Sequence, residues 1–181
     1  MNLIELSKEV SYALRHSPWE YELEIDEQGW VKVDQLLVAL RNAERWKNIK
    51  LSDLYIMIDK SDKKRFEISE GRIRALYGHS LPLKIYKEMM EPPIVLYHGT
   101  TDAIFLQIKK TGLLPMSRQF VHLSIDVETA VQVGKRRDKN PIILVIDALS
   151  AWNDGVAFYY GNEKVWLADS IPARYIKLGT P

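Results

Sequence analysis

The sequence contains no cysteine, and this absence removes several kinds of site at once. Disulfides, thiol nucleophiles and zinc sites built on thiolates are all excluded. No two of the four histidines stand four residues apart, and no His-Glu-x-x-His run occurs, so the sequence shows no histidine metal motif. We therefore expect no metal site.

A strong charge of one sign is also missing. The 181 residues carry a formal net charge of +1, whereas a protein that holds nucleic acid by bulk charge has a large basic excess. Any polyanion must therefore be held locally. No apolar run approaches the ~20 residues of a membrane helix, and residues 1–9 are charged and amphipathic, unlike a signal peptide. These features predict a soluble, cytoplasmic protein that binds no membrane.

The glycine motifs that hold nucleotides in many enzymes do not occur in this chain. No G-x-G-x-x-G follows a predicted strand, and neither a P-loop nor a nucleophile elbow is found. If a nucleotide binds, another architecture must hold it.

The first half of the chain predicts three helices and a β-hairpin. Apolar residues from Leu3 to Leu14 recur at helical spacing, and Pro18 lies just beyond them as a stop signal. Further on we expect a strand pair at residues 23–25 and 30–33, helices at 35–43 and 52–59 capped by Asp34 and Ser52, and hairpin strands at 65–68 and 73–76. This order is typical of a winged helix, and Glu91-Pro92-Pro93 predicts an extended linker after it.

The second half reads as mostly sheet. Expected strands lie at residues 94–97, 120–123, 141–146, 156–160, 165–167 and 174–178, and expected helices at 102–110 and 127–133. Gly112 and Gly134 are placed to end the two helices. The predicted fold class is therefore α+β, with one lobe over residues 1–91 and a second over residues 92–181.

The candidate functional features are two histidine-containing motifs, Arg15-His16 and His98-Gly99-Thr100, and two basic clusters. A lone histidine is more often a hydrogen-bonded structural residue, and runs such as Lys63-Lys64-Arg65 and Lys135-Arg136-Arg137 are more often solvated faces. Arg15-His16, however, stands at a helix end, and a guanidinium beside an imidazole is a good phosphate anchor. His98-Gly99-Thr100 follows an apolar strand, where scaffolds often present reactive groups.

Eight motifs of this chain resemble one known family in their order and residues. They are Leu14-Arg15-His16-Ser17-Pro18, Asp26-Glu27-Gln28-Gly29-Trp30, Asp62-Lys63-Lys64-Arg65-Phe66, Gly78-His79-Ser80, Tyr97-His98-Gly99-Thr100, Met116-Ser117-Arg118, Val121-His122-Leu123-Ser124 and Val133-Gly134-Lys135-Arg136. From about Ser7 to Ile176 the chain resembles the Tpt1/KptA family of NAD-dependent RNA 2'-phosphotransferases. The resemblance implies an N-terminal winged-helix lobe for RNA and a C-terminal ADP-ribosyltransferase-like lobe with a β-sheet for NAD.

The resemblance also implies a two-step reaction with NAD as co-substrate and no metal. An internal RNA 2'-phosphate attacks the anomeric carbon of the nicotinamide ribose and expels nicotinamide, giving an ADP-ribosylated RNA phosphate. The adjacent hydroxyl of the same ADP-ribose sugar then attacks the phosphorus and displaces the RNA 2'-oxygen. The products are 2'-hydroxyl RNA and ADP-ribose 1'',2''-cyclic phosphate. A tRNA splice junction is the best-known substrate of the family, and we expect a monomer.

Residue by residue, the resemblance assigns three groups of side chains. The implied catalytic set is Arg15, His16, Arg65 and Arg136; the implied NAD contacts are His98, Gly99, Thr100, Arg118, His122 and Ser124; the implied RNA contacts are Arg74, His79 and Ser80. Val165 falls where many protein-modifying ADP-ribosyltransferases have a glutamate. Tyr77 departs from the glutamine that the family often has before Gly-His-Ser.

Two other functions stay open on the sequence. One is a winged-helix nucleic-acid-binding protein with a degenerate second lobe, which would not need His98-Gly99-Thr100 or the His122-x-Ser124 pair. The other is an ADP-ribosyltransferase that modifies a protein or a nucleic-acid end and leaves the adduct in place. The Arg-His-Arg-Arg set argues against both.

Overall fold

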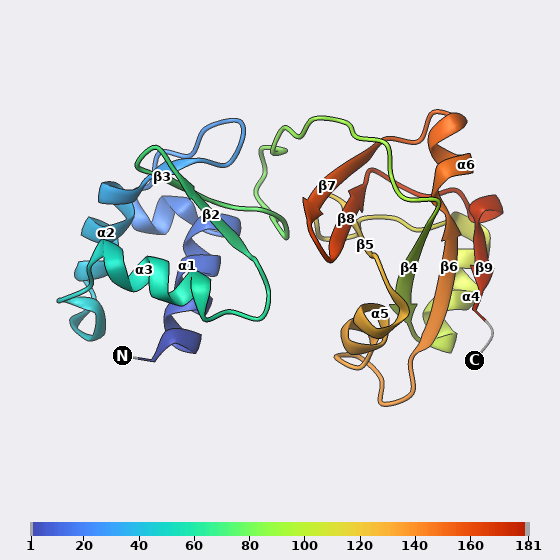
Figure 1. Cartoon of the computed structure of the whole chain (residues 1–181), viewed down its shortest axis with the longest axis horizontal. Helices are drawn as coiled ribbons and strands as arrows, with labels where there is room; N and C mark the ends of the chain where they lie inside the picture. The colour runs from blue at the N-terminus through green and yellow to red at the C-terminus, as the bar shows by residue number, and fades with distance from the viewer. Residues whose placement is uncertain (1, 180–181) are drawn as a thin grey trace. The chain divides into compact units, whose positions relative to one another are not determined.

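The computed structural model describes residues 2–179 and divides the chain into two compact units, Met1–Tyr86 and Lys87–Pro181 (Figure 1). The division falls after Tyr86 rather than at the expected linker around Glu91. Both units mix helices with antiparallel sheets, so the α+β class is the one expected. None of the helices within residues 2–179 is long and apolar enough to cross a membrane.

The first unit packs three helices against a small antiparallel sheet. Its helices are α1 (Leu3–Arg15), α2 (Val33–Arg41) and α3 (Leu51–Asp59), and its strands are β1 (Val31–Lys32), β2 (Phe66–Ser69) and β3 (Arg72–Ala75) in the order β1-β3-β2. Short 3-10 turns cover Pro18–Tyr21 and Glu44–Trp46.

Helix α1 follows directly from its sequence pattern. Leu6, Val10 and Leu14 recur on one face and are fully buried in the core of the unit. The Asn2 side chain accepts hydrogen bonds from two free backbone N–H groups of the first turn. Pro18 begins the 3-10 turn just beyond the helix, so Arg15 stands at its C-terminal end.

The expected strand pair at residues 23–25 and 30–33 is wrong. Residues 23–25 lie in no strand, and Val31 and Lys32 pair instead with Ile73 and Arg72 of β3. Two local features explain the difference. Glu22 has a left-handed backbone (φ 51°), and the Asp26 carboxylate accepts hydrogen bonds from the N–H groups of Gln28 and Trp30, which closes a turn there.

The expected helix caps Asp34 and Ser52 are also wrong by two positions. Helix α2 has Lys32 at its N-cap, so Asp34 lies inside the first turn, where its negative charge interacts favourably with the helix dipole. Helix α3 has Lys50 at its N-cap, and the Asp53 carboxylate accepts the Lys50 N–H at 2.8 Å. Lysine in these cap positions gives no signal that sequence reasoning could have used.

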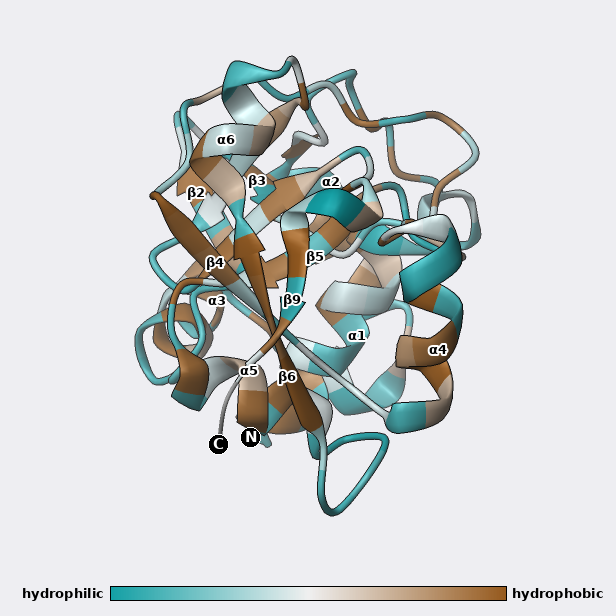
Figure 2. Cartoon of the chain, turned by 90° about the vertical axis from the view of Figure 1, so that its right-hand side faces the viewer, coloured by the Kyte–Doolittle hydropathy of each residue, from teal (hydrophilic) through white to brown (hydrophobic). Residues whose placement is uncertain are grey.

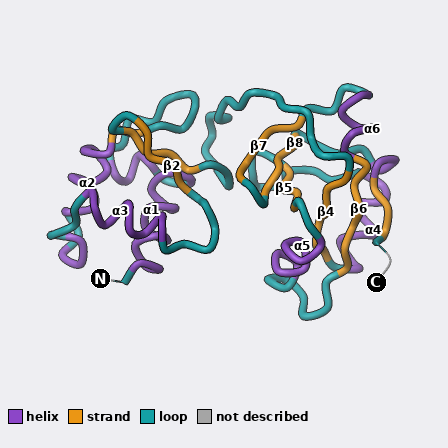
Figure 3. Tube along the Cα trace, viewed as in Figure 1, coloured by secondary structure: helices purple, strands orange, loops and turns teal. Residues whose placement is uncertain are grey.

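The second unit is built on a six-stranded antiparallel sheet (Figure 3). Its strands, in the spatial order β7-β8-β5-β4-β6-β9, are β7 (Phe158–Asn162), β8 (Val165–Ala168), β5 (Val121–Ser124), β4 (Val95–Thr100), β6 (Ile142–Asp147) and β9 (Ile176–Leu178). Its helices are α4 (Asp102–Thr111), α5 (Val127–Gly134) and α6 (Ala148–Asn153). The short helix α6 was not expected, and a 3-10 turn over Ala173–Tyr175 includes the first two residues of the strand expected at 174–178.

The sheet of the second unit has a seam between β4 and β5. Strand β4 pairs with β6 along its whole length, from Val95 to Thr100, and β5 pairs with β8 along its whole length. Between β4 and β5, by contrast, the registered pair in the described chain is Tyr97 with Ser124. Figure 2 shows β6 as a largely hydrophobic ribbon and β4 as hydrophobic in its first part, and both strands contribute buried residues to the core of the unit.

Helix α5 approaches β4 closely because two glycines face each other. A Cβ added at Gly99 would clash with the Ala130 carbonyl oxygen and lie 3.0 Å from the Gly134 nitrogen. A Cβ added at Gly134 would lie 2.5 Å from the Pro141 Cβ. Such separations leave no room for a side chain, so these glycines set the distance between helix and sheet.

Candidate functional site

Arg15 and His16 lie together at the end of α1. The Arg15 guanidinium carbon lies 5.5 Å from the centre of the Phe66 ring and 5.1 Å from that of Tyr77, within the range of a cation–π contact. The exposed His16 ring is hydrogen-bonded through Nδ1 to the Ser80 hydroxyl at 2.7 Å, and the Ser80 N–H donates to the Arg15 carbonyl at 2.9 Å. The two side chains are therefore held by the segment that follows β3.

Arg65 lies on the neighbouring segment, immediately before β2. Its carbonyl accepts the Leu76 N–H at 2.9 Å, and its guanidinium donates to the Ser61 hydroxyl at 2.8 Å. Phe66 and Tyr77, whose rings contact Arg15, directly follow Arg65 and Leu76 in sequence. The structure thus brings three of the four expected catalytic residues to adjoining segments of the first unit.

The three expected RNA contacts differ in their surroundings. Arg74 donates through two nitrogens to Glu67, at 2.9 and 2.8 Å, and lies 4.4 Å from the centre of the Trp30 ring. His79 is buried, with 2% of its surface exposed, while the Ser80 side chain is exposed. Arg74 and His79 therefore pack within the fold of the unit, and of the three Ser80 is the exposed side chain beside His16.

His98 of β4 spans the seam of the second unit. Its Nδ1 lies 3.0 Å from the His122 carbonyl oxygen, and because a carbonyl can only accept, Nδ1 carries the proton. Burial lowers the pKa of His98, the nearby Arg137 charge lowers it further, and the His122 carbonyl opposes this shift. The ring is therefore neutral at pH 7, with the Nε2 lone pair available as an acceptor.

Five of the six expected NAD contacts gather along the seam. Gly99 and Thr100 follow His98 on β4, while His122 and Ser124 lie on β5. His122 donates from Nδ1 to the Phe120 carbonyl at 3.0 Å, and Ser124 is buried opposite Tyr97. Gly99 has a packing role as well, because α5 leaves no space for a side chain there.

Arg118, the sixth, lies in the exposed loop before β5. Its N–H donates to the Pro115 carbonyl at 3.1 Å, and the intervening Met116 has a left-handed backbone (φ 57°). Arg136 is exposed in the turn that follows α5, where its N–H donates to the Val133 carbonyl. The turn and the helix thus place the backbone of each arginine and leave its side chain at the surface.

Sequence reasoning missed an ion pair near the seam. Asp126 caps α5 by accepting the Thr129 N–H at 2.7 Å, and Lys164 donates to it at 2.8 Å from the β7–β8 turn. The hydrogen bond from Lys164, followed by those from Thr129, lowers the pKa of Asp126 to about 2. An aspartate before a helical run was a readable cap signal, but its lysine partner is 38 residues away.

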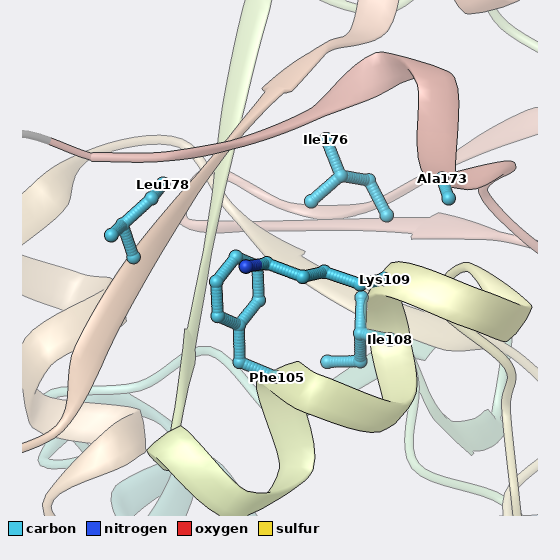
Figure 4. A pocket seen from close by; sticks show the side chains of 6 residues that line it. All are labelled: Phe105, Ile108, Lys109, Ala173, Ile176 and Leu178. Atoms are coloured by element: carbon cyan, nitrogen blue, oxygen red, sulfur yellow. The ribbon is translucent and has the colours of Figure 1, made fainter.

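A shallow apolar pocket lies elsewhere in the second unit, between α4 and the C-terminal segment (Figure 4). It is lined by Phe105, Ile108, Lys109, Ala173, Ile176 and Leu178. None of these is an expected site residue. Within residues 2–179, no group of three or more His, Asp or Glu side chains is placed to share a metal ion.

Each unit thus presents its own chemistry. The first holds an arginine–histidine pair beside a further arginine, a combination suited to a phosphate ester. The second holds a neutral histidine and hydroxyl side chains along the seam between β4 and β5, which can form hydrogen bonds with a polar ligand. The arginines and histidine of the first unit are typical of a protein that acts on a phosphorylated substrate.

Comparison with known proteins gives the family. Residues 1–170 match the family described as RNA 2'-phosphotransferase, Tpt1/KptA family. A probable RNA 2'-phosphotransferase from Acetivibrio thermocellus is 61% identical over 173 residues, which cover 96% of this chain and 95% of that protein. One from Bacillus thuringiensis subsp. konkukian is 60% identical over 173 residues (96% and 94%), and one from Pyrococcus horikoshii is 38% identical over 174 residues (95% and 96%).

This chain therefore belongs to the Tpt1/KptA family of RNA 2'-phosphotransferases. Its activity class is that of a transferase whose substrate is RNA.

Proposed function

We propose that this enzyme moves an internal RNA 2'-phosphate to NAD, giving 2'-hydroxyl RNA, nicotinamide and ADP-ribose 1'',2''-cyclic phosphate. The observation that carries the proposal is the pair Arg15 and His16, which the segment after β3 holds in place at the end of α1. In this proposal the first unit is a winged-helix lobe for RNA, and the second an ADP-ribosyltransferase-like lobe for NAD.

Arg15, His16 and Arg65 are assigned to the RNA 2'-phosphate. A phosphate monoester is already anionic near neutral pH, so the first step needs charge neutralisation and positioning more than it needs a base. Arginine forks meet both needs, because they bind phosphate oxygens in pairs. Since Arg65 donates to Ser61 and the Arg15 guanidinium lies beside two rings, little side-chain freedom would be lost on binding.

The seam between β4 and β5 is assigned to NAD. The hydrogen bond to the His122 carbonyl keeps the proton of His98 on Nδ1. The Nε2 lone pair of His98 can therefore accept a hydrogen bond from a ribose hydroxyl. Thr100, His122 and Ser124 would supply further polar contacts, and Arg118 would contact the phosphates of the co-substrate. Gly99 contributes by allowing α5 to approach β4.

Val165 supports a phosphate rather than a hydroxyl as the attacking group. It begins β8, paired with Ser124 at the seam, and it stands where the resemblance would otherwise place a glutamate. A glutamate there would help a neutral nucleophile, whereas an apolar residue suits one that is already an anion. This point favours transfer from an RNA phosphate over modification of a protein side chain.

Arg136 is assigned to the second step. As the ribose hydroxyl bonds to phosphorus and the RNA 2'-oxygen leaves, negative charge grows on the phosphoryl oxygens, and an arginine stabilises that charge. Arg136 is exposed after α5, so its side chain reaches solvent in the second unit.

Because the net charge is only +1, the enzyme would contact only a few phosphates around the modified nucleotide, for example in a tRNA. We also propose that it acts as a monomer.

The experiment that tests this function uses an oligoribonucleotide with one internal 2'-phosphate. With NAD present, each RNA dephosphorylated should release one nicotinamide. Without NAD the RNA should stay unchanged. Dephosphorylation that proceeds equally without NAD would refute the proposal, and stable accumulation of ADP-ribosylated RNA by the wild-type enzyme would favour an ADP-ribosyltransferase.

A further inference from the structure

Tyr77 contacts Arg15 in a way that the roles assigned so far leave unexplained. Its ring centre lies 5.1 Å from the guanidinium carbon, and that of Phe66 lies at 5.5 Å, so two aromatic rings contact one cation. Phe66 is buried in the core of the first unit, and this packing accounts for an aromatic ring at that position. Tyr77 follows β3 and is only partly buried, so the core does not require it.

The residues after Tyr77 complete the contact. Gly78 has a left-handed backbone (φ 88°), and a Cβ added there would lie 3.4 Å from a terminal nitrogen of Arg15. The Ser80 N–H then donates to the Arg15 carbonyl. Residues 77–80 therefore lie along Arg15, from its backbone carbonyl to the end of its side chain.

We propose that Tyr77 is a positioning residue, which holds the Arg15 guanidinium in the orientation that receives the RNA phosphate. The proposal rests on the role of Arg15 proposed above. An arginine side chain has many rotamers, and ordering it when substrate binds costs free energy. A ring whose face contacts the guanidinium orders it in advance, and such a contact does not use the in-plane N–H groups through which arginine binds phosphate oxygens.

The test compares two replacements of Tyr77 with a matched control. Tyr77→Leu removes the ring, Tyr77→Phe keeps it, and Tyr55→Leu removes an exposed tyrosine from α3. We expect Tyr77→Leu to lower kcat/KM for the phosphorylated RNA about tenfold, as loss of one partly buried cation–π contact would. Tyr77→Phe and Tyr55→Leu should stay within about twofold of wild type, and KM for NAD should not change in any of the three.

An Arg15→Ala background separates positioning from other roles of Tyr77. If Tyr77 acts through Arg15, Tyr77→Leu should weaken affinity for the phosphorylated RNA in the otherwise wild-type chain and have no further effect on that affinity in the Arg15→Ala background. An equal loss with and without Arg15 would overturn the proposal, because it would show a direct contact of Tyr77 with RNA or a general loss of structure. Wild-type kinetics in Tyr77→Leu would overturn it as well.

Two further outcomes keep this inference distinct from the proposed function. If Arg15→Ala itself is fully active, the role of Arg15 fails and the inference fails with it. If Arg15→Ala is inactive while Tyr77→Leu is normal, only the inference fails. Should Tyr77→Leu not fold, Tyr77→Met replaces it as the variant without a ring, with the same expected loss and the same refuting results.

Discussion

Replacing Gly99 with alanine tests whether this glycine sets the distance between β4 and α5. The added methyl group would clash with the Ala130 carbonyl oxygen and lie 3.0 Å from both the Ala130 carbonyl carbon and the Gly134 nitrogen. These are backbone atoms of one helix, which cannot rotate away as a side chain could. Helix α5 as a whole would have to move from the sheet.

The expected cost of Gly99→Ala lies at the upper end of the range for overpacking, about 3 kcal/mol. For a chain of this size, that cost corresponds to a fall in melting temperature of roughly 10 °C. Thermal unfolding followed by circular dichroism measures it, with Glu128→Ala on the exposed face of α5 as the control. A Gly99→Ala variant that melts like the wild type but has lost NAD affinity would refute the packing argument and leave Gly99 as a ligand contact alone.

Three further predictions concern single side chains. Arg15→Ala should abolish turnover and leave NAD affinity unchanged in a titration, and an equal loss of NAD affinity would contradict its assignment to RNA. Arg136→Ala should accumulate ADP-ribosylated RNA in a gel time course, with Arg136→Lys recovering only part of the rate because an ammonium lacks the paired N–H geometry; a slow variant that never shows the adduct would place the defect earlier. The folded pKa of Asp126, about 2, lies below its usual 3.8, so its contribution to stability is present above pH ~4 and is lost as pH falls toward 2. Acid unfolding of Asp126→Asn should therefore depend less steeply on pH over this interval, and an unchanged profile would show that the pair with Lys164 does not form in solution.

Much of the fold was readable because its signals are local. The spacing of apolar residues from Leu3 to Leu14 predicted α1, and the strand patterns at residues 65–68 and 73–76 predicted the hairpin of β2 and β3. What failed depended on partners distant in sequence. Val31 could pair with the segment before it or with β3, and the alternating pattern cannot tell these apart. The lysine caps of α2 and α3 follow no residue preference.

The candidate site shows the same division. The motifs gave the identities of Arg15, His16 and His98, but not how each is held. The hydrogen bond from His16 to Ser80 joins residues 64 apart, and the seam at His98 depends on how β4 and β5 pair. The ion pair between Arg74 and Glu67 was not predicted either, because it forms only when β2 and β3 lie side by side. A side chain expected to meet RNA is thus engaged within the hairpin.

The most direct test of the central claim follows the phosphate itself. An oligoribonucleotide whose internal 2'-phosphate carries radioactive phosphorus is incubated with the enzyme and NAD, and the products are separated. The proposed reaction predicts that all of the label lost from RNA appears in ADP-ribose 1'',2''-cyclic phosphate. Recovery of the label as inorganic phosphate would contradict it, because the enzyme would then be a phosphatase rather than a transferase to NAD.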